Sequence, residues 1–176
     1  VATDQLVSAQ PGLVPQGKGT ATRARIWGAT IFVDHATDWT KVHLMQDASG
    51  DSTLEAKNAF ERDCMLRNVV PRGYHADNGR YAENTFKQDC INKNQTLTFS
   101  GFAEHHKNVV AEANIKQLTL PSRTILLHAQ RHWPEYITTM LWPFALLAAA
   151  DRMNHLHTYR YKWKDPRNEI LSSYWL

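Results

Sequence analysis

The stretch His75-Ala76-Asp77-Asn78-Gly79-Arg80-Tyr81 places a carboxylate between a predicted strand and a predicted turn. The strand is expected over Val69 to Ala76, and Asn78-Gly79 favours a turn because both residues tolerate positive φ. An acidic side chain at the carboxyl end of a strand, beside a loop, is well placed to bind a metal or to act in catalysis. By itself, Asp-Asn-Gly is more typical of an ordinary surface turn, so the interpretation depends on further carboxylates.

The composition is that of an ordinary globular chain. With 176 residues, of which 43% are hydrophobic, the chain can bury a sizeable core in one domain. Its formal net charge of +3 permits a nucleic-acid partner without requiring one. Cys64 and Cys90 are too few and too far apart for a CxxC pair or a disulfide scaffold, which indicates a reducing compartment.

The sequence contains no targeting or membrane signal that we recognise. No run of about 18 apolar residues is present, so no membrane-spanning helix and no membrane partner are predicted. Val1 is not an initiator Met, and the residues after it do not resemble a signal peptide. We therefore expect the sequence to be a piece of a longer protein.

The first part of the chain alternates between strand and helix patterns. We expect a strand over residues 1–8, a loop over 10–22, and a hairpin of strands 29–33 and 39–45 with a turn at 34–38. After the hairpin, we expect a helix from a Ser52/Glu55 capping box to Leu66, a helix over 83–92 and a strand over 96–99. Together with the strand that precedes Asp77, this order predicts a single domain of mixed α/β class.

From Asn108 onward the pattern is helical. Small or apolar residues recur at steps of four and three and predict one buried face of a long helix: Ala111, Ile115, Leu118, Ser122, Ile125 and Ala129. Pro121 lies inside this pattern and is expected to kink or break the helix near Thr119. Pro134 suits the first turn of another helix, whose inward-packing residues are expected to be Tyr136, Met140, Phe144 and Leu147.

Glu112 lies on the predicted long helix, one residue past Ala111 and therefore off the buried face. Thirty-four residues separate it from Asp77, and the intervening helix and strand could bring the long helix back beside the first turn. Grouped carboxylates can bind two divalent metals about 3.5–4 Å apart for phosphodiester cleavage or transfer. Oxygen ligands suit Mg²⁺, with Mn²⁺ as a substitute. The alternative is a solvated Glu112 paired with Lys116 at i+4.

Three blocks of sequence carry a family resemblance: Thr3-Asp4-Gln5-Leu6, Ala76-Asp77-Asn78-Gly79-Arg80-Tyr81, and His105-His106-Lys107-Asn108-Val109-Val110-Ala111-Glu112. Further matches are Phe32-Val33-Asp34-His35, Leu126-Leu127-His128-Ala129, Trp133-Pro134, Leu141-Trp142-Pro143-Phe144-Ala145-Leu146 and Asn154. From Ala2 to about Asn154, the chain resembles the catalytic core of a copia-type retrotransposon integrase, in the RNase H-like superfamily. The resemblance implies an α/β fold with a five-stranded mixed sheet flanked by helices.

The resemblance also implies a function. It makes Asp4, Asp77 and Glu112 the D,D,E set that binds two Mg²⁺ ions and joins element cDNA ends to target DNA. The implied partners are DNA and further copies of the chain in a homo-oligomer, and the implied location is the nucleus after a cytoplasmic particle stage. The core would span residues 1–157, and residues 158–176 would be a basic, aromatic C-terminal extension.

Two residues compete for the first acidic position, Asp4 and Asp34. In this family's fold the first strand lies beside and parallel to the strand that carries the second Asp, whereas the hairpin strand runs antiparallel to both. An acid at the carboxyl end of that hairpin strand therefore lies toward the wrong edge of the sheet. We predict that Asp4 belongs to the site and that Asp34, with Asp38, holds backbone N–H groups in the hairpin turn.

Polar residues around the carboxylates are candidates for DNA contacts. Lys116 and Thr119 share the exposed helix face of Glu112, and Asn78 directly follows Asp77. By resemblance, a loop that engages substrate contains His105, His106, Lys107 and Asn108, although a solvated loop is the alternative. A further pair, His128 and His132, is spaced by one helical turn but matches no complete zinc set, so both are predicted to be ordinary histidines.

The chain departs from the family pattern at several positions. Lys107 and Val109 replace a Gln and a Gly before the helix, and Ala113 replaces an Arg that commonly follows the Glu. Pro121 lies where the family helix usually runs unbroken. These departures motivate a second hypothesis, a noncatalytic DNA-binding or assembly domain of a decayed or domesticated element. A ribonuclease H-type hydrolase is a third, because it shares the metal chemistry.

Overall fold

The computed structural model describes residues 1–15, 22–100 and 109–155, and its strands form one five-stranded sheet. In chain order the elements are β1 (Ala2–Leu13), β2 (Arg25–Val33), β3 (Thr40–Met45), α1 (Gly50–Met65), β4 (Gly73–Ala76), the 3₁₀ helix η2 (Arg80–Ala82), α2 (Asn84–Asn92), β5 (Thr96–Phe99), α3 (Val109–His132), the 3₁₀ helix η3 (Thr139–Leu141) and α4 (Trp142–His155). None of the helices in these described ranges is long and apolar enough to cross a membrane.

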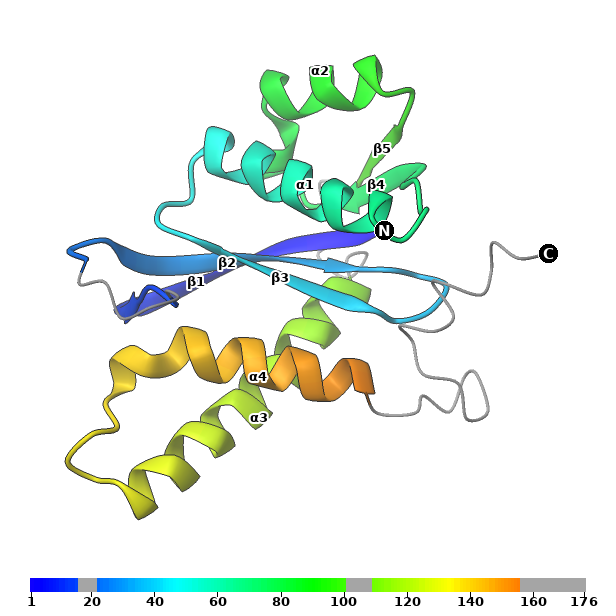
Figure 1. The fold of residues 1–176 in the computed structure, drawn as a ribbon. Helices are drawn as coiled ribbons and strands as arrows, with labels where there is room; N and C mark the ends of the chain where they lie inside the picture. The colour runs from blue at the N-terminus through cyan, green and yellow to red at the C-terminus, as the bar shows by residue number, and fades with distance from the viewer. Residues whose placement is uncertain (16–21, 101–108, 156–176) are drawn as a thin grey trace.

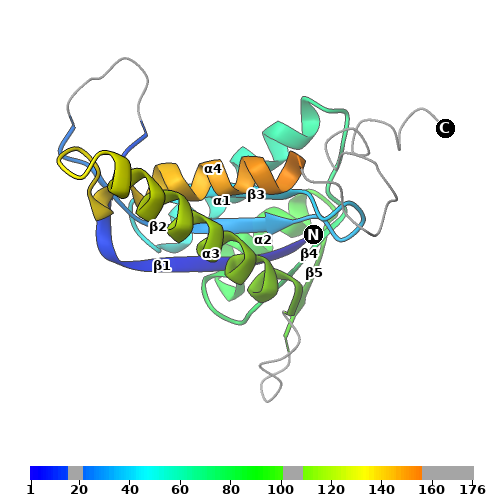
Figure 2. The same cartoon turned by 90° about the horizontal axis from the view of Figure 1, so that it is seen from below.

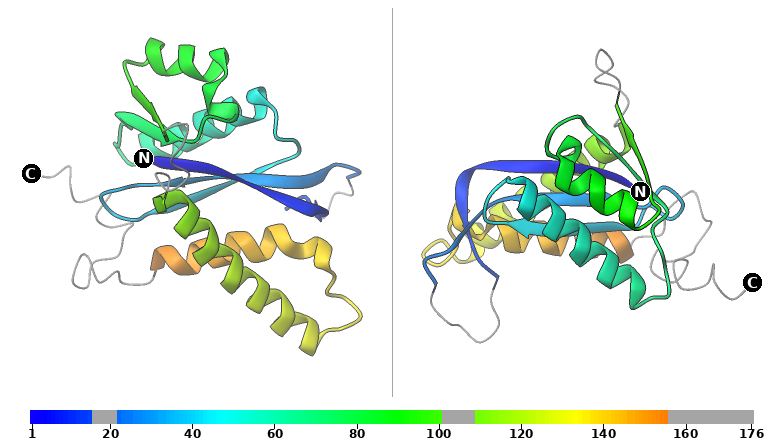
Figure 3. Two further views of the ribbon diagram at one scale, coloured as in Figure 1. Left: turned by 180° about the vertical axis from the view of Figure 1, so that it is seen from behind. Right: turned by 90° about the horizontal axis from the view of Figure 1, so that it is seen from above.

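The sheet is mixed and has the strand order β3-β2-β1-β4-β5. β2 is antiparallel to both of its neighbours, whereas β4 is parallel to β1 and to β5. Helices α1 and α2 cover one face and α3 and α4 cover the other (Figure 1). The view from below places α3 and α4 in front of the sheet (Figure 2). The view from behind shows the same three layers, and the view from above places α1 and α2 in front of the sheet (Figure 3). The predicted five-stranded mixed sheet flanked by helices is confirmed.

An aromatic core fills the space between the sheet and the α1/α2 layer. Phe32 of β2 stacks on Phe60 of α1 with ring centroids 4.6 Å apart, and Tyr74 of β4 meets Phe86 of α2 edge-on at 6.0 Å. All four rings are at most 2% exposed. Burying such a ring contributes about 1.5–3 kcal/mol, so this cluster fixes α1 and α2 against β2 and β4.

A smaller-residue core fills the space on the opposite face. Ala2, Ile31 and Val33 of the sheet pack there with Ala111 and Leu118 of α3 and with Leu146 of α4. The predicted buried face of the long helix is confirmed, because Ala111, Leu118 and Ser122 are buried and Ile115 and Ile125 pack partly against the core. Small side chains at these positions let α3 approach the start of β1 closely.

A buried polar node ties both of these helices to the start of β3. Asn154 of α4 accepts a hydrogen bond from the Thr40 N–H at 2.9 Å and donates one to the Thr40 carbonyl at 2.7 Å. Asn114 of α3 donates to the Thr40 hydroxyl oxygen at 2.8 Å. All three residues are buried, so these bonds fix the positions of α3 and α4 on the sheet.

Several predicted boundaries were wrong. The first strand runs on to Leu13 through a bulge between Val7 and Gly12, beyond the predicted end at residue 8. The strand before Asp77 is shorter than predicted and starts at Gly73, after Pro71, which lacks the N–H that strand pairing needs. The N-cap of α1 is Ser49, whose hydroxyl accepts the Ser52 N–H, so the helix begins before the predicted Ser52 cap.

Two predictions about the C-terminal helices were also wrong. α3 is not broken at Pro121 and continues to His132; next to the proline, the Ser122 hydroxyl donates to the Leu118 carbonyl at 2.6 Å. Pro134 does not begin a helix, because α4 starts at Trp142 with Pro143 in its first turn, where a missing N–H costs nothing. Consequently Tyr136, at 76% exposed, and Phe144, at 41%, do not pack inward as predicted.

Lys57 of α1 is fully buried and holds a network of charges on the α1/α2 face. Its ammonium group pairs with Glu61 at 2.7 Å and with Asp89 of α2. Burial alone would raise the pKa of Glu61, but hydrogen bonds from Lys57, Lys93, Gln95 and Tyr74 outweigh it and lower that pKa to about 2. The network therefore couples α1 to α2 and to β4.

Replacing Lys57 by Ala should lower the free energy of unfolding by about 3 kcal/mol, because two partly buried acids lose their buried cation and keep only the more exposed Lys93. Urea unfolding of the purified chain at pH 7 measures this. The matched control is Lys41→Ala, which removes the half-exposed pair between Lys41 and Asp63 and should cost less than about 1 kcal/mol. Equal losses in the two variants would show that the Lys57 network adds no special stability.

Candidate functional site

The parallel pairing of β1 with β4 positions two of the predicted carboxylates. Ala2 is the register partner of His75, and the His75 N–H donates to the Val1 carbonyl at 2.9 Å. Asp4 and Asp77 each follow two residues later, so they come from the same face of the sheet on adjacent strands. That face is the one that α3 covers.

Asp77 begins the turn that the sequence predicted after β4. Its carboxylate accepts the Gly79 N–H at 3.0 Å, and the Asn78 side-chain amide donates to the Ser100 carbonyl at 3.2 Å. The predicted reason for this turn was wrong, because Gly79 has a φ of −71° and Asn78 does not have a positive φ. Glycine is favoured here because a Cβ at position 79 would lie 3.1 Å from the Asp77 carboxylate.

Glu112 lies in the first turn of α3 and is exposed, as predicted. Lys116 follows it on the same helix face and is exposed as well. The alternative of an ion pair between them is not supported, since the described residues include no such pair. The Thr119 hydroxyl donates a hydrogen bond to the Lys116 carbonyl at 3.2 Å, so its donor is already used within the helix.

The three carboxylates act on one another electrostatically. Burial raises the pKa of Asp4, the Gln5 N–H at 2.7 Å lowers it, and the negative charges of Asp77 and Glu112 raise it further, to about 6. None of the three carboxylates forms an ion pair within the described ranges. The structure therefore brings Asp4, Asp77 and Glu112 into one negatively charged group.

An open pocket of about 440 Å³ borders this group. It is lined by Asp4 and Asp77 and by residues that the sequence reasoning did not assign: Gln5, Val7, Gly79, Arg80, Tyr81 and Glu83. Arg80 pairs with Glu83 at 2.9 Å, and the buried Tyr81 hydroxyl accepts a hydrogen bond from Thr3 at 3.1 Å. Arg80 and Tyr81 directly follow the predicted Asn78-Gly79 turn, but their residue types alone did not indicate that they line a pocket.

The carboxylates of Asp4, Asp77 and Glu112 are ligands of the type that a divalent cation binds, although they do not lie close enough together to form a closed metal site. Carboxylate oxygens are the ligands that Mg²⁺ and Mn²⁺ prefer, and a cation would offset both the burial and the neighbouring negative charges that raise the pKa of Asp4. Within the described ranges, however, no three His, Cys, Asp or Glu side chains are grouped closely enough to hold a metal ion. The donor set is therefore suited to the metal, and its side chains would have to draw closer on binding.

The other predicted residues lie elsewhere. Asp34 accepts hydrogen bonds from the N–H and the hydroxyl of Thr37 at 3.0 and 2.9 Å, which confirms its role in the hairpin turn. His106, Lys107 and Asn108, with His105, fall outside the described residues. His128 and His132 are exposed on α3 and pack ring to ring at 4.7 Å, with no third metal ligand among the described residues. The roles predicted for Asp4, Asp77, Glu112, Lys116 and Asn78 stay predictions.

Comparisons with known proteins identify the fold. No protein-family profile matches the sequence, and no curated protein matches it either. The integrase catalytic core domain of HTLV-2, solved in complex with magnesium in a trimeric form, superposes with a TM-score of 0.61 at 15% identity, covering 96% of this chain and 93% of that one. The catalytic core domain of BIV integrase gives a TM-score of 0.63 at 13% identity, covering 98% and 93%.

A larger assembly contains a similar chain. In the simian T-cell lymphotropic virus intasome, in complex with PP2A regulatory subunit B56 gamma, the matching chain gives a TM-score of 0.65 at 14% identity. The match covers 97% of this chain and 54% of that one. At such identities the likeness establishes the fold, which is the RNase H-like fold of integrase catalytic cores.

Replacing Asp4 by Asn should stabilise the protein at pH 8. The folded-state pKa of about 6 lies above the ordinary value of 3.8, so ionised Asp4 costs stability above pH 6 and the cost disappears as the pH falls toward 4. With a discount for partial exposure, we expect a gain of about 1 kcal/mol, or about 2–4 °C in Tm, at pH 8 and none at pH 4.

Thermal unfolding in metal-free buffer at the two pH values measures the effect. Asp34→Asn is the control, because Asn can keep the turn hydrogen bonds and Asp34 lies outside the carboxylate group. A lower Tm for Asp4→Asn at pH 8 would show that ionised Asp4 does not cost the folded protein stability.

Proposed function

We propose that the chain is the catalytic core of a copia-type retrotransposon integrase, a metal-dependent polynucleotidyl transferase that processes cDNA ends and joins them to target DNA. One observation carries the proposal: Asp4 of β1 and Asp77 at the end of β4 line one open pocket, and Glu112 at the start of α3 is near enough for its charge to act on Asp4. An acidic group of this kind is suited to metal-assisted phosphoryl transfer.

The comparisons support the proposal at the level of the fold. The similar HTLV-2 core was solved with magnesium, and the similar simian virus chain belongs to an intasome. We extend these properties to this chain as part of the proposal, with Mg²⁺ as the cofactor, Mn²⁺ as its substitute and DNA as the partner. A homo-oligomer and a nuclear location after a cytoplasmic particle stage are parts of the same proposal.

The chain's own residues would hold and orient the reacting groups. Asp4 and Asp77 would bind metal from adjacent strands, and Glu112 would complete the set from α3. When bound, two divalent cations would activate a water or 3′-hydroxyl and stabilise the leaving oxygen of the phosphodiester. Lys116 is exposed one turn beyond Glu112 and would contact a DNA phosphate.

A second candidate is a noncatalytic DNA-binding or assembly domain. The observation that favours it is the spacing of the carboxylates, which does not form a closed metal site in the described ranges. Such a domain would bind DNA with a salt-dependent affinity that needs no metal. The two candidates therefore differ in how an acidic-residue variant behaves.

Replacing Asp77 by Asn should reduce strand transfer on a model DNA end by about 100-fold or more, because a direct metal ligand is lost while the shape of the side chain is kept. The assay follows joining or disintegration of labelled DNA with Mn²⁺ and with Mg²⁺. Asp34→Asn is the matched control and should keep the activity, because Asp34 lies in the β2–β3 turn.

The remaining outcomes separate the alternatives. Full activity in Asp77→Asn would overturn the mechanism. Metal-independent DNA binding that survives Asp77→Asn, with no joining by the parent chain, would favour the noncatalytic domain. Preferential cleavage of an RNA–DNA hybrid over duplex DNA would instead indicate a ribonuclease H-type nuclease.

A further inference from the structure

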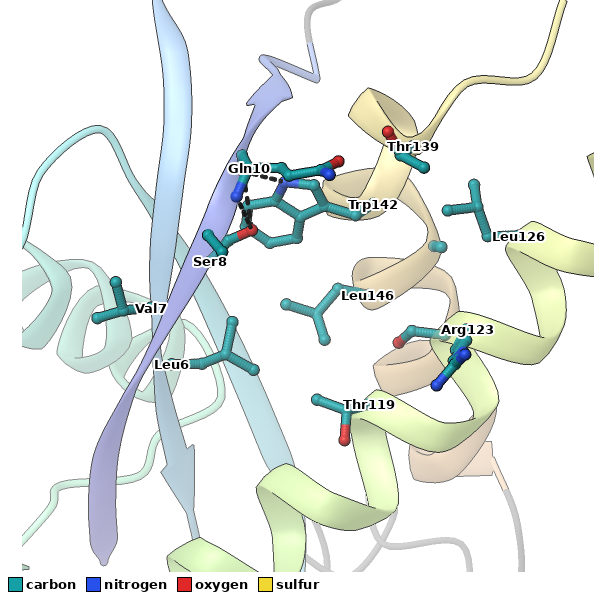
Figure 4. A pocket seen from close by; sticks show the side chains of 13 residues that line it. Leu6, Val7, Ser8, Gln10, Thr119, Arg123, Leu126, Thr139, Trp142 and Leu146 are labelled. Atoms are coloured by element: carbon teal, nitrogen blue, oxygen red, sulfur yellow. Dashed lines mark hydrogen bonds between the residues drawn. The ribbon is translucent and has the colours of Figure 1, made fainter.

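An apolar pocket of about 400 Å³ lies between β1, α3 and the start of α4. Figure 4 shows side chains from all three elements around it, with Leu6 from β1, Leu126 from α3 and Leu146 from α4. A volume of this size lies within the range of pockets that bind small molecules or single groups of a larger ligand. The proposed reaction does not use this pocket.

Trp142 forms one wall of the pocket and is held in place. Its indole N–H donates to the Gln10 carbonyl at 3.1 Å (Figure 4). Gly12 of β1 packs so closely on the start of α4 that a Cβ there would lie 2.3 Å from Pro143 and 2.7 Å from the indole nitrogen. The indole ring is therefore a fixed aromatic surface rather than a mobile side chain.

The α3 side of the pocket carries polar and positive groups. Thr119 and Arg123 line it from successive turns of α3, and Arg123 is exposed. Neither Arg123 nor Lys116 forms an ion pair with another described residue. An apolar pocket beside unpaired cations suits a ligand with a flat apolar part and a negative part.

The pocket adjoins the carboxylate group. Val7, which is 69% exposed, lines both this pocket and the one beside Asp4 and Asp77. Leu6 follows Asp4 by two residues on the same face of β1, a rise of about 7 Å, and Thr119 follows Glu112 by two helical turns, about 10 Å. These distances correspond to about two or three nucleotides of a stacked DNA strand.

We infer that this pocket binds the base of an unpaired nucleotide, two or three positions along the DNA strand whose phosphate lies at the carboxylates. The inference rests on the proposed function. The base would stack on or beside Trp142 among the leucines, and Arg123 would contact its phosphate. A base inside a duplex cannot enter, since both of its faces are already stacked.

Other occupants fit the pocket less well. A peptide strand adding to the free edge of β1 would need the backbone groups of Gln10. The Gln10 N–H already donates to the Ser8 hydroxyl at 3.2 Å, and the Gln10 carbonyl accepts from Ser8 at 2.8 Å and from Trp142. A purely apolar ligand would leave the positive charge of Arg123 unused. A nucleotide uses both the apolar walls and the cation.

The test measures binding of three fluorescein-labelled duplexes in metal-free buffer: one with a three-nucleotide overhang, one with the same overhang lacking its bases, and one with blunt ends. The parent chain should bind the base-containing overhang about tenfold more tightly than the abasic one, because each stacked base contributes about 1–3 kcal/mol. Leu126→Trp fills the pocket and should reduce this preference to within about twofold while leaving blunt-end binding unchanged.

Leu127→Trp is the matched control, because Leu127 is the next residue of α3 but is 56% exposed and does not line the pocket. It should keep the full preference for the base-containing overhang. Equal binding of the base-containing and abasic overhangs by the parent chain, or equal effects of Leu126→Trp and Leu127→Trp, would overturn the inference. Displacement of a bound apolar dye by fatty acid but not by the overhang would also overturn it.

The assay separates this inference from the proposed function. Strand transfer that depends on Asp77, without any preference for overhang bases, would remove the pocket proposal alone. Preference for overhang bases without strand transfer would support the pocket and remove the catalytic proposal. Absence of binding to all three duplexes, together with absence of strand transfer in the presence of metal, would overturn both.

Discussion

The parallel pairing of β1 with β4 decides where chemistry can occur on this fold. It rests on the Ala2–His75 register and on two backbone contacts of Val1, whose ammonium group donates to the Gly73 carbonyl at 3.1 Å and whose carbonyl accepts the His75 N–H. Because the two strands run in the same direction, their acids emerge side by side. The antiparallel β2 instead ends at Val33, opposite Ala2, so it carries Asp34 past the start of β1, in the direction opposite to Asp4 and Asp77. Beyond the end of β4, β1 is paired only with β2 among the described strands, and Val7 on its free edge lines both pockets.

The third carboxylate depends on a different set of contacts. Glu112 is exposed, so its own side chain does not fix its position. Two residues later, Asn114 is buried and bonded to Thr40, and Asn154 holds both backbone groups of Thr40 from α4. The distance between Glu112 and the two aspartates is therefore set by β3 and α4, far from the pocket. Because the helix is anchored at this node, the closing of the carboxylates around a cation would have to come from their side-chain rotamers.

Sequence periodicity predicted the layers of the fold because burial on one face repeats with the period of the element. The stripe from Ala111 to Ile125 identified the buried face of α3, and the same reasoning placed Glu112 on its exposed face. Predictions based on single residues were less accurate. Pro121 removes one helical hydrogen bond, but the burial of Leu118 and Ser122 on either side holds the helix together. Lys57 gave no sign of burial, because its partner Asp89 lies on another helix.

The two faces of the sheet differ in whether their acidic side chains are paired with basic ones, and this difference is informative about function. On the α1/α2 face, Glu61 and Asp89 are matched by Lys57 and Lys93, and the pKa of Glu61 falls to about 2. On the α3 face, Asp4 forms no ion pair with a described residue; burial raises its pKa, and the charges of Asp77 and Glu112 add to the rise, to about 6. A chain selected only for stability gains nothing from unbalanced acids, because their repulsion costs free energy in every folded molecule. A cation that binds only the folded state would remove this repulsion. The free energy gained by removing the repulsion would then add to the binding free energy of the cation. The same sheet thus combines one half whose acids are paired with lysines and another half whose acids form no ion pair among the described residues.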